Sequence, residues 1–400
     1  MRILAIETSC DETAISILEC SGGLSAPVFS LLGTGLFSQA HLHEKYGGVY
    51  PNLARREHEK NIIPLLEVAL KEAGGLKIED GEEINLDSVF PILESILIRE
   101  QILTPQFKEF LTKNPHIPNI DAIAITQGPG LEPALWVGVN FAKALSYIWQ
   151  KPLIPVNHME GHILSVLINP DPSSPLLAPT ISFPAIALLV SGGHTELQLV
   201  NNWLSYTRLG ETRDDAVGEA FDKVARLMGL PYPGGPEISR LAGEARKNPS
   251  ADISIKLPRP MIKSDDYDFS FAGLKTAVLY MTRDHGEMSD EYKRELAREF
   301  EDAAVDVLCA KTKKALEEFG ATTLIVGGGV IGNKYLRERL ASLLAEEFPN
   351  VQLCMPTRDL STDNAVMIGI AGYLRYEKTP TEYSVFSPDQ TLKASGTLRL

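Results

Sequence analysis

The sequence predicts an α/β protein built from two related lobes, and three observations support this prediction. The chain has 400 residues, which is long for a single hydrophobic core and comfortable for two. Short apolar runs typical of buried strands alternate with segments whose apolar residues recur at helical spacing. A unit of strand, polar turn and strand opens the chain at 2–20 and returns at 185–200, and such a duplication indicates two related lobes.

Composition narrows the class of protein. Hydrophobic residues make up 44% and charged residues 22% of the chain, as in ordinary folded proteins. The net charge of −14 argues against a general nucleic-acid coat, because phosphate binding needs positive charge. The net charge does not exclude a local basic patch, or nucleic-acid binding with the help of a partner. The four cysteines form no CxxC pair, so we expect reduced thiols rather than a cysteine zinc site or a disulfide framework.

The beginning of the chain does not resemble a signal peptide. Its apolar run is short, and Glu7 interrupts it. Apolar stretches of about 18 residues, which a membrane-spanning helix needs, are absent from the sequence. We therefore expect a cytoplasmic protein without a membrane partner.

The first lobe is expected over residues 1–178. Strands are predicted where short apolar runs occur, at 2–7, 14–20, 121–126 and 152–156. Helices are predicted where the spacing is helical, at 52–73, from the glycine–proline turn at 127–134 to about 149, and at 157–168. Residues 76–118 begin with an acidic stretch and continue as two weakly amphipathic segments, so we expect a partly helical insertion on the surface.

The second lobe is expected over residues 179–364, after a proline-rich loop at 169–180. It opens with the repeated strand–turn–strand unit and contains a long helix at 289–319 that Gly320 ends. A strand, a glycine turn and a helix follow at 322–348. We expect a final helix at 365–385 that packs between the lobes, and a loose tail at 386–400.

Three glycine-bearing turns are expected directly after apolar strands: SGGHT at 191–195, PGGPE at 233–237 and GGGVIGN at 327–333. Glycine lets backbone N–H groups come close to a phosphate or a ribose. A single glycine pair is more often a tight turn that binds nothing, but three together favour a nucleotide site. The chain has neither a P-loop nor a GxGxxG turn with its ribose-binding acid, which disfavours P-loop and Rossmann enzymes.

A metal site is suggested by His158 and His162, which are four residues apart in HMEGH. On a helix this spacing puts both imidazoles on one face, where they can bind one divalent ion. Two surface histidines are the common alternative for this spacing alone. Asp363 is a candidate third ligand, because it precedes a helix after a turn. Glu160 lies roughly 200° around the helix from the first histidine, so a zinc protease of the HExxH type is disfavoured.

Eight motifs occur in order along the chain: IETSCDET, GPGL, HMEGH, LLVSGGHT, GEAFDK, YPGGPE, DFSFAGLKTA and STDNA. Together they closely resemble the catalytic subunit of the universal tRNA threonylcarbamoyladenosine transferases, a family formerly called O-sialoglycoprotein endopeptidases. The resemblance covers nearly the whole chain except about 76–118 and the tail. It implies a two-lobed actin/hexokinase/Hsp70-like (ASKHA) fold, with mixed β-sheets flanked by helices.

The resemblance also implies an activity and a set of site residues. The expected reaction moves a threonylcarbamoyl group from threonylcarbamoyl-AMP to the N6 amine of adenosine 37, in tRNAs reading codons that begin with A, and releases AMP. One divalent ion per subunit, Fe²⁺ or Zn²⁺, would be held by His158, His162 and Asp363. The adenylate would be held by Ser191, Gly192, Gly193, His194, Thr195, Asp222, Gly235 and Asn333. Ser9, Asp11 and Glu12 would be the catalytic residues.

The resemblance further implies partners: the tRNA anticodon loop, an inactive subunit of the same fold and a small ATPase. The helix at 52–73 is our candidate for the partner face. Candidates for binding tRNA are Arg55, Arg56, Lys256, Arg259, Lys263, Arg337 and Arg339. The alternatives are a small-molecule kinase of the same fold, an Hsp70-like binding module and a protease. The histidine pair argues against the kinase, because such kinases use phosphate-bound Mg²⁺ and carboxylates.

Overall fold

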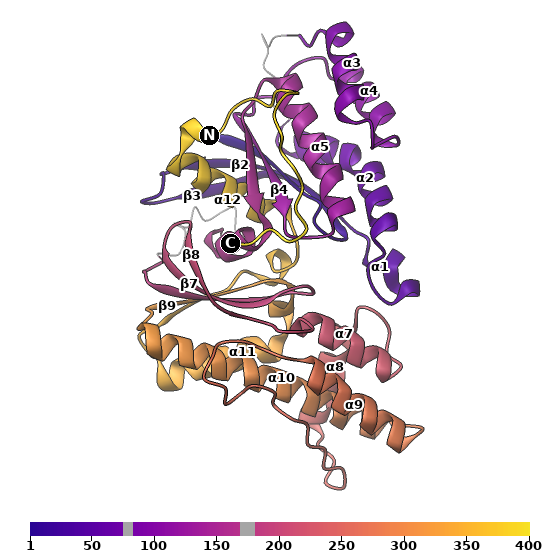
Figure 1. Ribbon diagram of the computed structural model, residues 1–400, viewed down its shortest axis with the longest axis vertical. Coiled ribbons are helices and arrows are strands. Elements are labelled where there is room, and N and C mark those ends of the chain that lie inside the picture. Colours follow the sequence, from indigo (N-terminus) through magenta and orange to yellow (C-terminus); the bar gives the residue numbers. More distant parts are fainter. Residues whose placement is uncertain (75–82, 169–180) are drawn as a thin grey trace. The chain divides into compact units, whose positions relative to one another are not determined.

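The computed structural model describes residues 1–74, 83–168 and 181–400 and divides into two compact units (Figure 1). The first unit comprises Met1–His41, Val49–Pro179 and Asp363–Leu400, and the second comprises Leu42–Gly48 and Thr180–Thr362. The segments predicted as a final helix at 365–385 and a tail at 386–400 both fall in the first unit. The helices of the described residues include none that is both long and apolar enough to cross a bilayer.

The first unit contains a mixed five-stranded sheet in the order β3-β2-β1-β4-β5. The strands are β1 (Arg2–Glu7), β2 (Glu12–Ser21), β3 (Val28–Ser38), β4 (Ala122–Gly128) and β5 (Leu153–Asn157). The first three pair antiparallel, and β4 and β5 continue the sheet in parallel with β1. Parallel neighbours need a crossover connection, and helices supply it here.

The second unit repeats this topology strand for strand, in the order β8-β7-β6-β9-β10. Its strands are β6 (Ala185–Val190), β7 (Thr195–Asn202), β8 (Ser205–Glu211), β9 (Thr323–Gly327) and β10 (Gln352–Cys354). The first three again pair antiparallel, and the last two are parallel to β6. The predicted α/β class with two related, mixed sheets flanked by helices is confirmed.

Helices surround each sheet. Those of the first unit are α2 (Pro51–Glu72), α3 (Leu86–Ile96), α4 (Leu103–Lys113), α5 (Glu132–Trp149), α6 (His158–Leu164) and α12 (Ala365–Lys378), and the short α1 spans Ala40–His43. Those of the second unit are α7 (Val217–Leu227), α8 (Gly234–Lys247), α9 (Ala272–His285), α10 (Asp290–Phe319) and α11 (Lys334–Glu347). Short 3₁₀ turns lie at Glu44–Tyr46, Ser165–Leu167, Gly329–Gly332, Arg358–Leu360 and Pro380–Glu382.

The two faces of the first sheet are covered by different helices. Leu4 and Ile6 of β1 share a hydrophobic cluster with residues of α2 and α5. Because side chains alternate along a strand, Ala5 points to the opposite face, where α12 packs. Small residues allow α12 to come very close: a Cβ added at Gly372 would lie only 2.6 Å from that of Ala124. This close packing places the chain just before α12 at the end of the sheet.

Part of the insertion predicted at 76–118 is buried, rather than lying on the surface as we expected. Residues 75–82, and the loop predicted at 169–180, lie outside the described residues. Within the insertion, however, α4 buries Phe107 completely and joins the core of the first unit. The face of α4 that carries Phe107, Phe110 and Leu111 is apolar enough to need this cover.

The expectation of a loose tail was wrong. The backbone N–H of Ser395 donates to Gln127 O at 2.9 Å, and Gly130 N–H donates to Gly396 O at 3.2 Å. Phe386 and Ala394 are buried. The tail therefore closes over the end of β4, because its apolar side chains and backbone groups find partners there.

One predicted glycine turn was also misplaced. PGGPE does not follow a strand: it lies between α7 and α8, and Gly234 begins α8. A Cβ at Gly234 would lie 2.4 Å from the Cβ of Ala225, so this glycine allows close packing of two helices. The other two turns do follow strands, β6 and β9.

Candidate metal centre and nucleotide-binding turns

The histidine helix begins directly at the end of a strand. Asn157 ends β5, and its side chain accepts hydrogen bonds from the N–H groups of Met159 at 2.8 Å and Glu160 at 3.4 Å. This N-cap fixes the first turn of α6, so His158 and His162 lie one turn apart. Both are buried, and their ring centroids are 4.7 Å apart. The predicted placement of both imidazoles on one helical face is confirmed.

Asp363 joins the two histidines from the other end of the chain. It immediately precedes Asn364, whose side chain caps α12 by accepting from Met367 N–H at 3.0 Å. One oxygen of Asp363 lies 3.4 Å from Nε2 of His158 and 3.2 Å from Nε2 of His162. The structure thus brings the three predicted ligand residues together, with ligand atoms within 4.8 Å of one another.

The donor set fits a divalent ion. His162 is fully buried, and neither of its ring nitrogens has a hydrogen-bond partner among the described residues, although Nε2 lies near Asp363. Buried polar atoms are nearly always satisfied, so an imidazole lone pair left in this way suits coordination. Two imidazoles and one carboxylate are ligands that Zn²⁺ and Fe²⁺ both accept.

The electrostatics of the cluster favour positive charge. Burial lowers the pKa of the His158 imidazole, but the carboxylates of Glu7 and Asp363 outweigh this and raise that pKa well above its ordinary value. Burial raises the pKa of Asp363, but His158 and His162 outweigh this and hold that pKa well below the usual range. A divalent ion would satisfy the same carboxylates that stabilise a proton on His158.

Glu160 takes no part in the cluster. Its side chain is buried and forms an ion pair with Arg375 of α12. The prediction that Glu160 points away from the histidines agrees with this pairing, so the arrangement differs from that of an HExxH protease.

The predicted catalytic turn follows β1 in the same unit. Ser9 is buried, its N–H donates to Oε1 of Glu7 at 2.5 Å, and its carbonyl accepts from Leu131 N–H at 2.7 Å. The carboxyl of Glu12 accepts from Ser38 Oγ at 3.1 Å. Burial, followed by the charges of Asp11 and Asp363, raises the pKa of Glu12 well above its ordinary value. A carboxyl whose pKa is raised in this way is a stronger base than an ordinary glutamate and is a candidate for exchanging a proton with a substrate.

Two buried residues that the sequence reasoning missed support this turn. Glu7 contacts both Ser9 and His158. His58 of α2 contacts the carbonyl oxygen of Cys10 through Nε2 at 3.0 Å and Thr13 Oγ1 through Nδ1 at 2.7 Å. The signal for Glu7 was an acidic residue at the end of an otherwise apolar strand.

In the second unit, the SGGHT turn is held by its own hydrogen bonds. Ser191 Oγ accepts from the N–H groups of Gly193 at 3.3 Å and His194 at 3.0 Å. Thr195 Oγ1 is buried and accepts from Val217 N–H at 2.8 Å. A Cβ added at Gly192 or Gly193 would meet no atom within 4 Å in the described part of the chain. Packing within the protein therefore does not require these glycines, which is consistent with space for a ligand.

The remaining predicted nucleotide residues lie in the same unit but differ in their contacts. Asp222 accepts from Gly234 N–H at 2.7 Å and so supports the beginning of α8, where Gly235 lies. Asn333 caps α11 by accepting from Leu336 N–H at 2.9 Å. Its amide also donates to Glu301 at 2.6 Å, which ties the glycine turn before α11 to the middle of α10.

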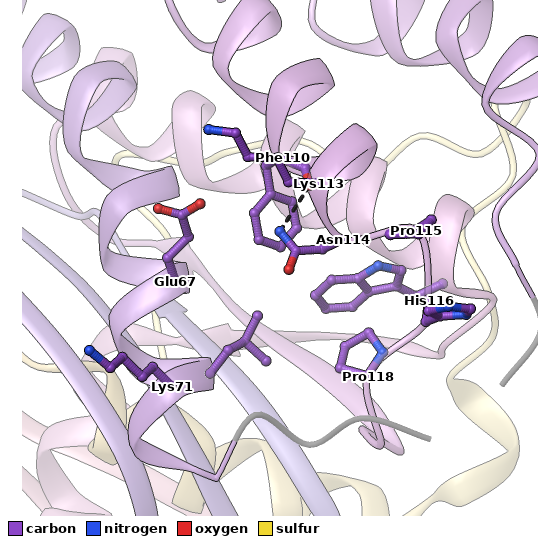
Figure 2. A pocket seen from close by; sticks show the side chains of 10 residues that line it. Glu67, Lys71, Phe110, Lys113, Asn114, Pro115, His116 and Pro118 are labelled. Carbon is purple, nitrogen blue, oxygen red and sulfur yellow. Dashed lines mark hydrogen bonds between the residues drawn. The ribbon is translucent and has the colours of Figure 1, made fainter. Parts of the chain in front are cut away.

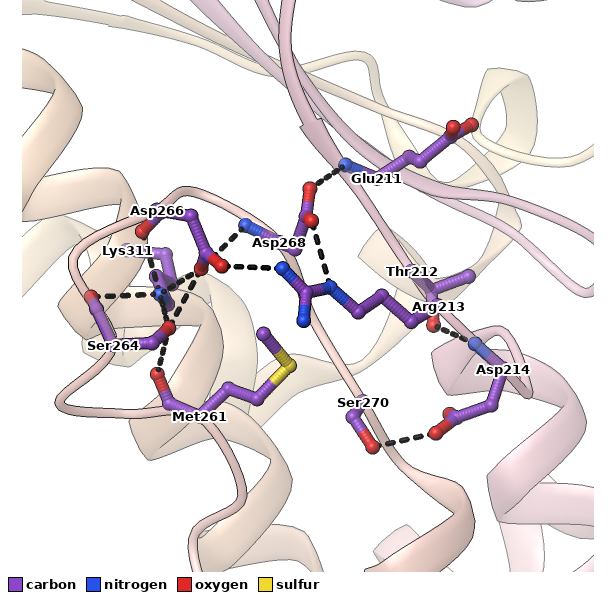
Figure 3. Close-up of polar contacts among 10 residues, drawn as sticks. All are labelled: Glu211, Thr212, Arg213, Asp214, Met261, Ser264, Asp266, Asp268, Ser270 and Lys311. Carbon is purple, nitrogen blue, oxygen red and sulfur yellow. Dashed lines mark hydrogen bonds and ion pairs between the residues drawn. The ribbon is translucent and has the colours of Figure 1, made fainter.

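A polar network supports the segment behind the SGGHT turn (Figure 3). Arg213 donates to Asp266 at 2.6 Å and to Asp268 at 2.8 Å. The buried Lys311 donates to Ser264 Oγ at 2.7 Å and to the carbonyl of Asp266 at 2.7 Å. These bonds fix the chain next to β8, whose following residue, Thr212, donates its N–H to Thr195 O at 2.8 Å.

A separate cavity of about 370 Å³ lies in the first unit, among α2, α4 and the end of α5 (Figure 2). Its lining residues are Glu67, Leu70, Lys71, Phe110, Lys113, Asn114, Pro115, His116, Pro118 and Trp149. It contains none of the predicted site residues.

Several cations suggested for tRNA binding already have partners. Arg55 pairs with Glu59 at 3.2 Å, and Arg259 pairs with Asp306 at 3.2 Å and also with Glu299. Arg337 donates to the carbonyls of Ile331 and Pro356, and Arg339 pairs with Asp306. The three that remain exposed and without an ion pair in the described part of the chain are Arg56, Lys256 and Lys263.

Fold and site together define an α/β protein of two units with the same sheet topology and a candidate metal centre in the first unit. A profile of the tRNA N6-adenosine threonylcarbamoyltransferases matches residues 30–85 and 99–370, omitting only α3 between them. The chain belongs to the tRNA N6-adenosine threonylcarbamoyltransferase family.

Relatives that carry this name support the assignment. One from Persephonella marina is 42% identical over 385 residues, which are 95% of this chain and 92% of the relative. One from Paraburkholderia xenovorans is 42% identical over 384 residues, 96% and 94% of the two chains.

Among solved structures, full-length HypF in its phosphate- and nucleotide-bound form aligns with 70% of this chain and 50% of its own, at 13% identity and a TM-score of 0.47.

Proposed function

We propose that this chain transfers the threonylcarbamoyl group of threonylcarbamoyl-AMP to the N6 amine of adenosine 37 in tRNAs that read codons beginning with A, and that AMP is released. The observation that carries the proposal is the convergence of His158, His162 and Asp363 in a member of this family. A small-molecule kinase of the same fold would have no use for a buried imidazole pair.

His158, His162 and Asp363 would hold one divalent ion, Fe²⁺ or Zn²⁺. Such an ion supplies a Lewis acid for an oxygen of the adenylate. The adenylate is a mixed anhydride with AMP as a good leaving group, so the reaction needs no covalent intermediate on the protein. What the protein must supply is positioning and stabilisation of the negative charge that develops during transfer.

The second unit would bind the adenylate. The N–H groups of the SGGHT turn are suited to phosphate oxygens, because the turn is preformed by Ser191 and kept open by two glycines. Asp222 and Gly235 would contribute to the sugar and base. Asn333 would act chiefly by fixing the turn before α11, because its side chain already bonds to Leu336 and Glu301.

The catalytic turn would handle the amine. The N6 amine of adenine is a weak nucleophile and loses a proton during transfer. Glu12 would accept this proton or orient the amine, with Asp11 beside it, since its raised pKa makes it a stronger base than an ordinary glutamate. Ser9 is held by Glu7 and lines the same turn.

The tRNA is expected to offer adenosine 37 from a single-stranded loop, where unstacking a base costs little. An acidic chain whose arginines are largely paired has few cations for the RNA backbone. The inactive subunit of the same fold and the small ATPase are therefore proposed as partners, with α2 as the contact helix.

The test combines the purified chain and its two partners with threonylcarbamoyl-AMP and unmodified tRNA, and detects modified nucleosides by mass spectrometry. Wild-type protein is expected to add the threonylcarbamoyl mass to adenosine. His162→Ala should lower the rate at least about 100-fold, and Lys313→Ala, which breaks an exposed pair, should not. Phosphorylation of a small molecule by ATP without tRNA, and no modified adenosine, would favour the kinase instead.

A further inference from the structure

Glu7 is a fully buried carboxylate at the end of an apolar strand. Its relative exposure is 0%, and the four residues before it, Ile3 to Ile6, are also fully buried. A carboxylate in such a place is costly unless hydrogen bonds and nearby positive charge compensate it. In the sequence, Glu7 is visible only as an acidic residue that interrupts an apolar run.

Each contact of Glu7 comes from a donor on a neighbouring strand, helix or turn. Oε2 lies 2.9 Å from Nδ1 of His158, at the beginning of α6. The same oxygen accepts from Oγ1 of Thr126 at 2.6 Å, on the neighbouring strand β4. Oε1 accepts from the N–H of Ser9 at 2.5 Å. The carboxylate is therefore held in one orientation by two strands and a turn, and it presents one oxygen to a histidine ring.

The contact with Nδ1 indicates which ring nitrogen of His158 is available to a metal ion. A neutral imidazole carries its proton on one nitrogen and a lone pair on the other. With an ion in the cluster, where His158 must be neutral to act as a ligand, the acceptor Glu7 would keep the ring proton on Nδ1 and leave the lone pair on Nε2. That nitrogen is 3.4 Å from Asp363, inside the cluster with His162.

We propose that Glu7 is a positioning residue that fixes the tautomer and orientation of His158 for metal binding. The inference rests on the proposed function, because it assumes that the cluster holds a divalent ion. A carboxylate bonded to the far nitrogen of a ligating histidine also makes the ligand more basic and strengthens the metal bond.

Charge balance supports the assignment. The two histidines are neutral as ligands, so the carboxylates of Glu7 and Asp363 together balance the two positive charges of the ion. His162 and Glu7 are fully buried, so an uncompensated charge there would be costly. Glu7→Gln keeps the shape and an oxygen acceptor but removes one negative charge, which leaves the loaded site with a net positive charge.

The experiment measures binding of Zn²⁺ and Co²⁺ to the full chain, without substrates. Zn²⁺ affinity is obtained by competition with a chromophoric chelator, and Co²⁺ reports ligand geometry through its visible absorption. Glu7→Gln is expected to weaken Zn²⁺ binding about 10–100-fold and to change the Co²⁺ spectrum. The matched control is Glu160→Gln, a buried glutamate of α6 that pairs with Arg375; it should bind Zn²⁺ as the wild type does.

Thr126→Val provides a second variant in case Glu7→Gln fails to fold, which thermal unfolding in EDTA will detect. It removes one of the two donors to Oε2 and should weaken Zn²⁺ binding at least about threefold. If the wild type binds one ion and a folded Glu7→Gln or Thr126→Val protein binds Zn²⁺ with unchanged affinity, the proposed role of Glu7 is wrong. The metal site itself would still stand. A wild type that binds neither ion overturns the metal site and this inference with it.

Discussion

Gly161 sets how closely the histidine helix approaches the helix that follows Asp363. A Cβ added there would lie 3.1 Å from Cδ1 of Ile368 and 3.1 Å from Cγ of Met367, both on α12. Carbon atoms pack best at about 3.5–4.0 Å, so even alanine requires a shift of roughly 0.5 Å. Both neighbours are flexible side-chain atoms that can adapt to alanine, and Gly161→Val is therefore the discriminating change.

The expected magnitude follows from the same geometry. Overpacking a well-filled contact costs about 1–3 kcal/mol. For a domain of roughly 200 residues, each kcal/mol lowers the melting temperature by about 2–4 °C, so we expect a fall of roughly 4–8 °C for about 2 kcal/mol. Separating α6 from α12 by about 0.5 Å exceeds the roughly 0.2 Å tolerance of ligand distances, so Zn²⁺ affinity should fall at least about tenfold.

Zn²⁺ competition and thermal unfolding, each with and without EDTA, provide the assay. Gly243→Ala in α8 is the matched control, because an added Cβ there meets nothing within 4 Å in the described structure. It should stabilise the protein by about 0.5–1 kcal/mol and leave Zn²⁺ binding unchanged. If Gly161→Val melts at a lower temperature but binds Zn²⁺ within twofold of the wild type, helix spacing does not set the ligand geometry and the reasoning is wrong.

Two further predictions concern stability. Burial raises the pKa of Glu100, whose Oε2 has no hydrogen-bond partner among the described residues, so its ionised form destabilises the fold above that pKa. Glu100→Gln should raise the free energy of unfolding by about 1 kcal/mol at pH 8, and this gain should vanish as the pH falls towards the pKa of the unfolded glutamate, about 4.3. Urea titrations at several pH values would measure the gain. An equal gain at pH 4 would contradict the prediction. Deletion of residues 386–400 removes the buried Phe386 and the bond to Gln127, and should cost about 3 kcal/mol by the same method; no change would restore the view of a loose tail.

Much of the fold could be predicted because its signals are local. The apolar runs of β1 and β6 were visible in the sequence, as was the helical spacing of His158 and His162. The cap residues that fix α6 and α12, Asn157 and Asn364, are equally local.

What could not be predicted depends on packing between distant segments. Strand β3 contains Gly33 and Gly35, which look like loop residues, yet a Cβ at Gly33 would lie 2.2 Å from Ala69 O of α2. Its glycines therefore serve the close crossing of a helix, which no window of the sequence reveals. PGGPE was misplaced for the same reason, since Gly234 is required by contact with Ala225.

Two buried glutamates show how an acidic residue in the sequence can indicate a fixed polar group in the fold. Glu7 and Glu301 are both fully buried, and each accepts hydrogen bonds from several groups, including groups on distant segments. Burying a carboxylate is unfavourable unless its partners are already in place, so its presence in an apolar strand or helix face implies a fixed group nearby that needs it. For Glu301 that group is Asn333 before α11, and for Glu7 it is His158. An acidic residue inside an apolar run is therefore a stronger guide to the working parts of this chain than its arginines, many of which already pair with carboxylates in the described structure.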